Sequence, residues 1–445
     1  MSGHVDKRQK KYRIKIESIL VFYHLQAEKE TKMRPLEGIK VIELATFVAV
    51  PTAGKFLADQ GAEVIKVEAK SGDPYRFAAA AEWRSPSPYE NTSFDLDNGG
   101  KKGIILNLKD PKGKEALFKL LEDCDIFLTN WRQKALAKQG LTYEDLHAKF
   151  PKMVFADCSG YGDVGPEKDL PGYDFTCFWA KAGASGSLRD KDGRPMNLVP
   201  GFGDHVAGFA LVGGVLAAYI KAQKTGVGER VTTSLLHTSI FSQAVMILSE
   251  QYPQYGESFP ISYKKLNNPF NSAYRTADDR YFQTCVPPFN FYYPKFMTAI
   301  GREDLADNKR YLIESISEND LYEEFMGILE EAFIKKTAAE WDRIFTEADI
   351  PHSICLTYKE LLTDPQVEAI GVFQKMNYPG NPDIKVARQP VSIDGKLADF
   401  DRGPYLGEHS EEVLKGLGYS DDDLKAMHEA GVYSTWEDLK AGLNG

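Results

Sequence analysis

The sequence predicts an α/β fold, with a parallel, doubly wound sheet in a large domain and a smaller α+β domain after it. Short apolar runs of strand length alternate with amphipathic segments of helix length in the first third of the chain. Strands that are separated by helices pair in parallel, because a helical crossover returns the chain to the same end of the sheet. The 445 residues are enough for two or three domains with a large core.

The alternation of strands and helices is regular from Leu36 onward. Strands are predicted at Ile39–Leu44, Ala62–Glu68, Ile104–Leu108, Asp125–Asn130 and Met153–Cys158. Helices are predicted at Pro51–Gln60, which has a proline in its first turn, from Asp110-Pro111 onward, and at Tyr143–Phe150.

The pattern changes after the fifth predicted strand. An apolar helix is predicted at Val206–Lys221, and another, rich in Ser, Leu and Met, at about Leu235–Gln251. Two charged helices and short aromatic strands at Arg280–Val286 and Phe289–Tyr293 predict the smaller domain between about Asn267 and Ile354. The polar tail from about Lys375 is expected to form loops and an acidic helical region around Asp421–Ala430.

Composition and charge exclude several classes of function. The net charge of −10 argues against nucleic acid or an anionic membrane as a partner, because both would repel an acidic surface. Five scattered cysteines without a CxxC pair indicate a reducing, cytoplasmic setting and no metal site. No apolar run comes close to the length that spans a bilayer.

The first 32 residues differ from the rest, with eight Lys/Arg against four Asp/Glu. They are expected to be a poorly ordered extension, or upstream sequence translated ahead of a start at Met33. A signal anchor is the less favoured alternative, because the apolar run is short and no small-residue cleavage site follows it.

Asp204 is the candidate reactive residue. It lies in the glycine-rich bend Pro200–Gly208, directly before the long apolar helix, and Gly201 and Gly203 allow close approach of backbone and ligand. The dipole of the helix favours a carboxylate at this end. The alternative interpretation is that Asp204 only caps the helix, since aspartate is among the best capping residues.

The carboxyl ends of the predicted strands carry a second set of candidates. In open parallel sheets, ligands bind at this edge. Lys109, Arg132 and Lys138 could hold an anionic, phosphate-bearing ligand there, and Trp131 could stack on a flat ring. Each lysine could instead be merely solvated, and Trp131 could belong to the core, but their convergence on one edge favours a nucleotide-like site.

A dinucleotide site of the NAD type is a weak alternative. Glu68, at the end of the second strand, resembles the acidic residue that holds a ribose in such folds. The first loop, Ala45–Val50, lacks GxGxxG, however, and without these glycines a pyrophosphate cannot approach the backbone closely.

An ordered series of motifs resembles the class III CoA-transferases, the formyl-CoA and carnitine CoA-transferase type. The resemblance covers about Pro35 to Gly418 and is carried by LEGIKVIELATFVAVPTAGKFLADQGAEVIKVE, GDPYR, LNLKDPKGKEAL, DIFLTNWR, GYGDVGP, PGYD, GFGDHVAG and KTGVGERV. The runs NWRQKALAKQG, GPEKDLPGYD and VPGFGDH are most similar to the subgroup that acts on 2-hydroxyacyl and 2-enoyl thioesters in amino-acid-fermenting anaerobes.

The resemblance implies a nucleophilic aspartate at Asp204, with coenzyme A as co-substrate and no permanently bound cofactor. It also implies an interlocked homodimer with a Rossmann-like domain assembled from both ends of each chain. The division expected is an extension at 1–32, the N-terminal part of the CoA-binding domain at 33–230, a linker helix and small domain at 231–360, and a segment returning to the large domain at 361–445. Carried over by position, CoA contacts fall on Val48, Ala49, Asn107, Lys109, Asn130, Trp131, Arg132 and Lys138.

Two departures from the family pattern are visible. The position after Glu68, an arginine in some members, is Ala69, which puts a phosphate contact there in doubt. The tetraglycine loop of formyl-CoA transferases has no counterpart near Asn267–Tyr274.

The reaction expected is transfer of CoA from a 2-enoyl- or 2-hydroxyacyl-CoA to a free 2-hydroxy acid, through aspartyl anhydride and aspartyl–CoA thioester intermediates. An α-methylacyl-CoA racemase is the main alternative. It uses a histidine in a Gly-His-Asp segment, and here Tyr173 takes that place, which is a poor base at neutral pH. His205 and His237 are expected to be structural.

Overall fold

The computed structural model describes residues 33–77, 87, 89–196, 198–252, 259–379 and 381–443. The chain divides into two compact units. Unit 1 comprises Met1–Gly172, Gly201–Leu235 and Phe373–Gly445, so that it draws on both halves of the chain, and unit 2 comprises Tyr173–Pro200 and Leu236–Val372. Residues 173–200 thus belong to unit 2, within the range expected for the large domain. The extension expected at 1–32 lies outside the described residues.

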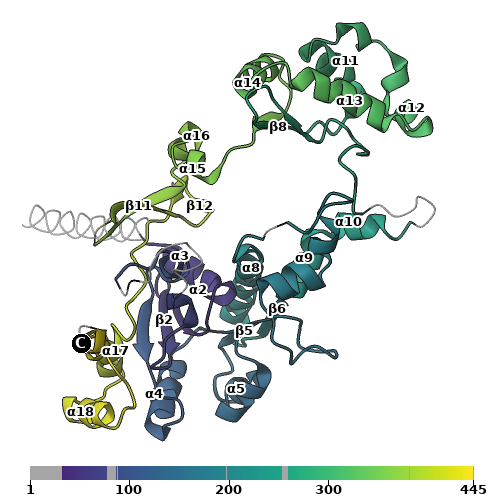
Figure 1. Ribbon diagram of the computed structural model, residues 1–445. Coiled ribbons are helices and arrows are strands. Elements are labelled where there is room, and N and C mark those ends of the chain that lie inside the picture. Colours follow the sequence, from purple (N-terminus) through teal and green to yellow (C-terminus); the bar gives the residue numbers. More distant parts are fainter. Residues whose placement is uncertain are drawn as a thin grey trace, which may run out of the picture. The chain divides into compact units, whose positions relative to one another are not determined.

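Unit 1 is built on a six-stranded sheet in the order β3-β2-β1-β4-β5-β6. Figure 1 labels its strands β2, β5 and β6. All neighbouring strands in the sheet pair in parallel, as the alternation of strands and helices predicts. The strands are β1 (Lys40–Leu44), β2 (Glu63–Glu68), β3 (Lys102–Ile105), β4 (Ile126–Thr129), β5 (Val154–Ser159) and β6 (Arg230–Ser234). Strand β6 was not predicted, because its sequence RVTTS contains a single apolar residue.

Unit 1 includes the helices α2 (Ala49–Asp59), α3 (Thr92–Asn98), α4 (Pro111–Glu122), α5 (Gln133–Gln139), α6 (Tyr143–Lys149) and α8 (Phe202–Thr225). Helices α4 and α6 begin at the predicted residues, α2 begins two residues before its predicted start, and α3 was not predicted. Asp110 caps α4 by accepting a hydrogen bond from Lys112 N, and Pro111 occupies the first turn, as predicted. Leu117, Leu121 and Leu136 from α4 and α5 are fully buried in the core beside the sheet.

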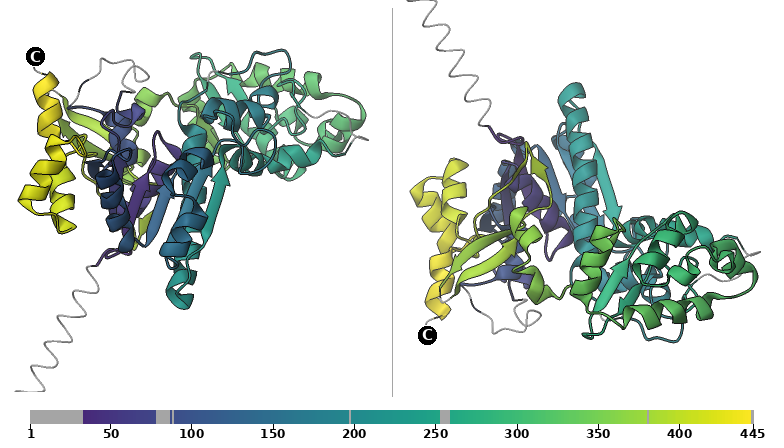
Figure 2. Two further views of the ribbon diagram at one scale, coloured as in Figure 1. Left: turned by 90° about the horizontal axis from the view of Figure 1, so that it is seen from below. Right: turned by 90° about the horizontal axis from the view of Figure 1, so that it is seen from above.

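Helix α8 runs alongside the sheet (teal in Figure 2) and packs against α2, β5 and β6. Among the described residues it is the helix long and apolar enough to cross a membrane by length and composition, with 24 residues and a mean hydropathy of 1.5 in its most apolar window. The statement from the sequence that no apolar run approaches this length is therefore wrong. The helix begins at Phe202, four residues before the predicted start at Val206.

The C-terminal segment of unit 1 covers the β3 edge of the sheet. Ser410 Oγ accepts a hydrogen bond from Ile105 N at 3.0 Å, and Val432 O accepts one from Asn107 N at 2.8 Å. The tail is more ordered than the predicted loops: it forms β10 (Phe373–Tyr378), β11 (Asn381–Ala387), β12 (Ser392–Ile393), β13 (Lys396–Leu397), α17 (Ser410–Gly416), α18 (Asp421–Glu429) and α19 (Trp436–Leu443). Helix α18 coincides with the predicted acidic helical region.

Unit 2 has an aromatic core and a small antiparallel sheet in the order β7-β8-β9. Its elements are a π-helical segment (Asp174–Lys181), α7 (Ala184–Ser187), α9 (Leu235–Ser242), α10 (Ala244–Ser249), β7 (Ala273–Arg275), β8 (Tyr281–Thr284), α11 (Phe289–Ala299), two 3₁₀ turns (Glu303–Leu305 and Lys309–Tyr311), α12 (Ile313–Glu318), α13 (Tyr322–Phe333), α14 (Ala338–Glu347), β9 (His352–Ile354), α15 (Tyr358–Leu361) and α16 (Pro365–Ala369).

Two predictions for unit 2 need correction. The strand predicted at Phe289–Tyr293 is the start of helix α11: Phe289, Tyr293 and Phe296, at helical spacing, all enter the aromatic core. Their β-propensity misled the prediction, since burial in a tertiary core overrides it. The helix predicted at Leu235–Gln251 is interrupted at Gln243, whose amide nitrogen lies 3.0 Å from Ala182 O.

Candidate active site

The strand order of unit 1 reverses between β1 and β4, and the segments that follow these two strands meet there. Asn130, directly after β4, binds the backbone of Thr46 after β1 through both ends of its amide. Thr46 N donates to Asn130 Oδ1 at 3.1 Å, and Asn130 Nδ2 donates to Thr46 O at 2.6 Å. Ligands of open parallel sheets bind at such a reversal. This is where the expected contacts Val48, Ala49 and Asn130 lie, and the role seen for Asn130 is to hold the first loop.

The turn that carries Asp204 packs on the same loop. Val48 and Ala49 begin helix α2, and a Cβ added at Gly201 would lie 3.6 Å from Val48 Cγ1. One turn further along α8, a Cβ added at Gly208 would lie only 2.6 Å from Ala49 O, so a glycine is needed for the close approach of the two helices. The structure therefore brings the candidate nucleophile and the first predicted CoA-binding residues to one place.

Asp204 is the third residue of α8, and its side chain is half-buried. Gly201 occupies the N-cap with a φ of 76°, a conformation that favours glycine. The interpretation of Asp204 as the N-cap is therefore wrong. The carboxylate lies in the first turn, where the positive end of the helix dipole favours a negative charge.

A buried network of charges contacts the backbone of the first loop, Ala45–Val50. Lys66 Nζ lies 2.9 Å from Glu43 Oε1 and 3.0 Å from Asp73 Oδ2, and it donates to Ala45 O at 2.8 Å. Asp73 Oδ1 accepts from Phe47 N at 3.0 Å, where Phe47 has the strained φ of 63°. The network thus fixes an unusual backbone conformation just before Val48.

In this network, the neighbouring charges favour the ionised forms of Glu43 and Lys66. Burial alone would lower the pKa of Lys66, but Glu43 and Asp73 outweigh it and raise the pKa above its usual value. Burial likewise raises the pKa of Glu43, and Lys101 and Lys66 together hold it below the ordinary value. Lys101 Nζ, 2.7 Å from Glu43 Oε2, also donates to Pro51 O at 2.8 Å, which ties the network to α2. Burial lowers the pKa of Lys101 to about 8.

The remaining predicted residues are more dispersed. Asn107 and Lys109 are exposed after β3, two strands from β1 on the same edge of the sheet, or about 10 Å away. Arg132, at the N-cap of α5, and Lys138, in its last turn, are exposed as well. Trp131 is half-buried and packs against the core of unit 1.

Glu68 has a structural partner. Its carboxylate accepts hydrogen bonds from Arg76 Nε at 2.9 Å, Arg76 Nη2 at 2.6 Å and Asp73 N at 2.8 Å. Sequence reasoning did not single out Lys66, Asp73 or Lys101. Lys66 could have been found from the sequence, because it lies in the middle of the apolar strand AEVIKVE, where a buried cation must have a partner.

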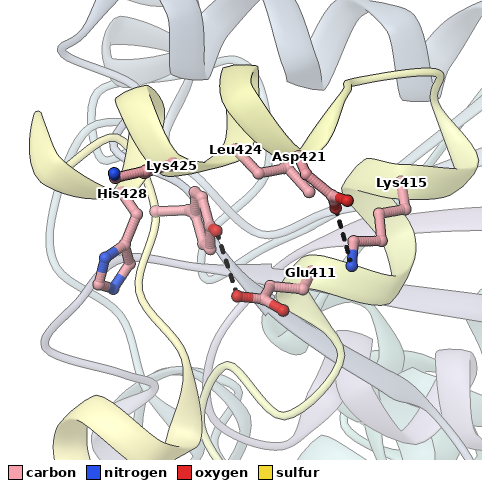
Figure 3. A pocket seen from close by; sticks show the side chains of 7 residues that line it. Glu411, Lys415, Asp421, Leu424, Lys425 and His428 are labelled. Atoms are coloured by element: carbon pink, nitrogen blue, oxygen red, sulfur yellow. Dashed lines mark hydrogen bonds and ion pairs between the residues drawn. The ribbon is translucent and has the colours of Figure 1, made fainter.

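A polar pocket of about 250 Å³ lies between α17 and α18 and contains none of the predicted site residues (Figure 3). An ion pair of 3.2 Å between Lys415 and Asp421 and a hydrogen bond of 3.5 Å from Tyr433 to Glu411 line it. His428, also in its wall, lies 2.8 Å from Asp438. Its polar groups thus largely satisfy one another.

Comparison with known proteins identifies the family. Residues 36–410 match the model of CoA-transferase family III. The chain belongs to this family. The family III CoA-transferase is therefore an enzyme that uses CoA thioesters as co-substrates, as the motifs of the sequence predict.

Two curated relatives align with almost their whole length. A cinnamoyl-CoA:phenyllactate CoA-transferase of Clostridium sporogenes is 46% identical over 404 residues, 90% of this chain and 97% of the relative. A (R)-2-hydroxy-4-methylpentanoate CoA-transferase of Clostridioides difficile is 39% identical over 399 residues, 89% of this chain and 99% of the relative.

A solved structure supports the fold. The crystal structure of a CAIB/BAIF family protein from Brucella suis has a TM-score of 0.73 and 25% identity, and the match covers 87% of this chain and 100% of that one.

Proposed function

We propose that this family III CoA-transferase moves CoA from a 2-enoyl- or 2-hydroxyacyl-CoA to a free 2-hydroxy acid with an aryl or branched side chain, and that Asp204 is its nucleophile. The observation that carries the proposal is the packing of the Asp204 turn on Val48 and Ala49. The substrate class is supported by the names of the two relatives, which act on phenyllactate and on 2-hydroxy-4-methylpentanoate.

The proposed reaction needs one carboxylate and no external reactant. An Asp204 oxygen attacks the thioester carbonyl of the donor, the C–S bond breaks, and an acyl–aspartyl anhydride and CoA thiolate result. The thiolate attacks the aspartyl carbonyl, which forms an aspartyl–CoA thioester and releases the donor acid as its carboxylate. The acceptor carboxylate then displaces the thiolate to give a second anhydride, and the thiolate takes the acceptor acyl group and restores Asp204. Covalent catalysis of this kind replaces one difficult exchange by several steps of similar energy.

The surroundings of Asp204 suit this chemistry. A nucleophilic carboxylate must be ionised, and the positive end of α8, where Asp204 lies, favours a negative charge. Backbone N–H groups of the Gly201–Gly203 turn are the candidate donors to the oxyanion of the tetrahedral intermediates. Such a donor typically contributes about 3 to 4 kcal/mol to catalysis.

CoA is proposed to bind along the carboxyl edge of the sheet. Val48 and Ala49 would contact its reactive end, with Asn130 holding their loop, and Asn107, Lys109, Trp131, Arg132 and Lys138 would follow the rest of the molecule. The order β3-β2-β1-β4-β5-β6 is that of nucleotide-binding doubly wound sheets, which supports a Rossmann-like, CoA-binding unit 1.

The test is covalent trapping. After incubation with cinnamoyl-CoA, hydroxylamine should modify Asp204, and Asp204→Ala should abolish both this label and CoA exchange with phenyllactate while the protein stays folded. Asp364→Ala is the matched control. Asp364 caps α16 by accepting from Gln366 N and Val367 N, so its loss should cost about 1 kcal/mol of stability and no activity.

Undiminished turnover in Asp204→Ala would refute the proposal. A racemase would instead exchange the α-hydrogen of the acyl group for deuterium in the absence of any acceptor acid. A panel of acceptor acids, read by mass spectrometry, would then define the acyl pair.

We further propose that the enzyme is a cytoplasmic homodimer that serves amino-acid fermentation. Helix α10, with the sequence AVMILS, has no buried residue within its own chain; its Val245 is 71% exposed, and Phe241 of the preceding helix α9 is 79% exposed. Apolar surface of this kind is typical of an interface. Light scattering should give twice the chain mass of 49.8 kDa, and a stable monomer would exclude the dimer.

A further inference from the structure

His205 follows the proposed nucleophile in the chain, and its ring contacts a buried aspartate. His205 Nε2 lies 3.1 Å from Asp97 Oδ1, and Asp97 is only 1% exposed. The two residues are 108 positions apart, so the contact joins the first turn of α8 to the end of α3.

Asp97 has two side-chain hydrogen-bond partners among the described residues, and His205 is one of them. Asp97 Oδ1 also lies 2.8 Å from Thr52 Oγ1, but this hydroxyl has a single proton and lies 2.9 Å from Val48 O as well. Asp97 Oδ2 is buried and has no hydrogen-bond partner among the described residues. Because a buried carboxylate is costly without donors, loss of the imidazole would leave Asp97 with the shared hydroxyl of Thr52 as its hydrogen-bond donor among the described residues.

The Cε1 atom of His205, which is bonded to Nε2, faces the glycine bend. A Cβ added at Gly201 would lie 3.6 Å from His205 Cε1, and His205 N donates to Gly201 O at 2.9 Å. The ring, which is 33% exposed, thus touches both α3 and the bend that begins α8. Asp204 lies between Gly201 and His205 in the chain, so its backbone is fixed on both sides.

We propose that Asp97 and His205 are positioning residues that hold the first turn of α8 in one orientation for the reaction of Asp204. This inference rests on the proposed function. Asp204 must meet two different acyl carbons and, as an acyl group itself, be attacked by a thiolate and a carboxylate. A displacement of about 1 Å can slow such a step about 100-fold.

The experiment measures how fast Asp204 becomes labelled when the enzyme is mixed with cinnamoyl-CoA and hydroxylamine. His205→Leu removes the donor to Asp97 and should slow labelling about 10- to 100-fold, with KM for cinnamoyl-CoA unchanged. His205→Gln should recover most of the rate, because its longer amide places a donor near the Nε2 position. His205→Asn, equally polar but shorter, should not.

The matched control is His428→Leu. This substitution removes another histidine–aspartate contact of unit 1, in which His428 Nε2 lies 2.8 Å from Asp438 Oδ2. His428 lies in the wall of the pocket in Figure 3. Asp204 of this variant should be labelled at the wild-type rate.

Labelling of His205→Leu at the wild-type rate would overturn the inference, and so would equal rates for His205→Gln and His205→Asn. The latter comparison decides the matter if the leucine variant does not fold. If the wild-type enzyme is not labelled at all, the proposed nucleophile itself is wrong, and the inference is lost with it.

Discussion

Replacing Gly208 by alanine should separate α8 from α2 and impair activity more than stability. The added Cβ would lie 2.6 Å from Ala49 O and 2.7 Å from Thr52 Cβ, whereas ordinary contacts begin at 3.4 Å. The helices must therefore move apart by about 0.8 Å, the difference between 3.4 and 2.6 Å. This shift occurs between the turn of Asp204 and the loop of Val48 and Ala49.

The expected magnitudes follow from two opposing effects. Overpacking of a tight contact typically costs about 1 to 3 kcal/mol. Alanine in place of glycine inside a helix raises the unfolding free energy by about 1 kcal/mol, because alanine has the higher helix propensity. Gly208→Ala should thus lose about 0 to 2 kcal/mol of unfolding free energy. Because a misplacement near 1 Å can cost about 100-fold in rate, kcat/KM should fall about 10- to 100-fold.

The control lies on the same helix. A Cβ added at Gly213 meets no atom within 4 Å. Gly213→Ala should therefore raise the unfolding free energy by about 1 kcal/mol and retain activity. Urea unfolding measures the stability of both variants, and exchange of CoA between cinnamoyl-CoA and phenyllactate measures their activity. The reasoning is refuted if the two variants have the same stability and the same kcat/KM.

Two further predictions concern buried charges. Lys66→Met should lower the unfolding free energy, measured in urea, by about 3 to 5 kcal/mol. The substitution leaves the buried carboxylates of Glu43 and Asp73 without this partner. Lys102→Met, which breaks exposed pairs with Glu63 and Glu412, should cost less than about 1 kcal/mol, and equal losses would contradict the role given to the network. Burial raises the pKa of Asp95 to about 6, despite hydrogen bonds from Tyr378 and Gly403 N, so the folded state takes up a proton before the unfolded chain does. Its contribution to stability therefore rises as the pH falls from about 6 to 4, and the stability of Asp95→Asn relative to wild type should rise by up to about 2 to 3 kcal/mol between pH 4 and 7.5. A difference independent of pH in paired urea titrations would exclude this effect.

Much of unit 1 could be predicted because its signals are local. Apolar strand runs, the Asp110-Pro111 helix start and the glycine bend before Asp204 each depend on a few neighbouring residues. The failures have local causes too. Phe289–Tyr293 has strand-like composition but packs as a helix in an aromatic core, and β6 is too polar to be recognised as a strand. In the first case tertiary contacts outweighed propensity, and in the second the apolar pattern was too short.

The sequence by itself determined the α/β class, the family and the candidate nucleophile, because each of these is recognised from short motifs of neighbouring residues. Only the tertiary structure decided what surrounds Asp204. Asn130 binds Thr46 from 84 residues away, and Asp97 meets His205 across 108 residues. Such contacts depend on the order of the strands and on the close packing of α2 against α8. Both are set by burial and hydrogen bonding across the whole unit, which a local pattern of residues does not encode.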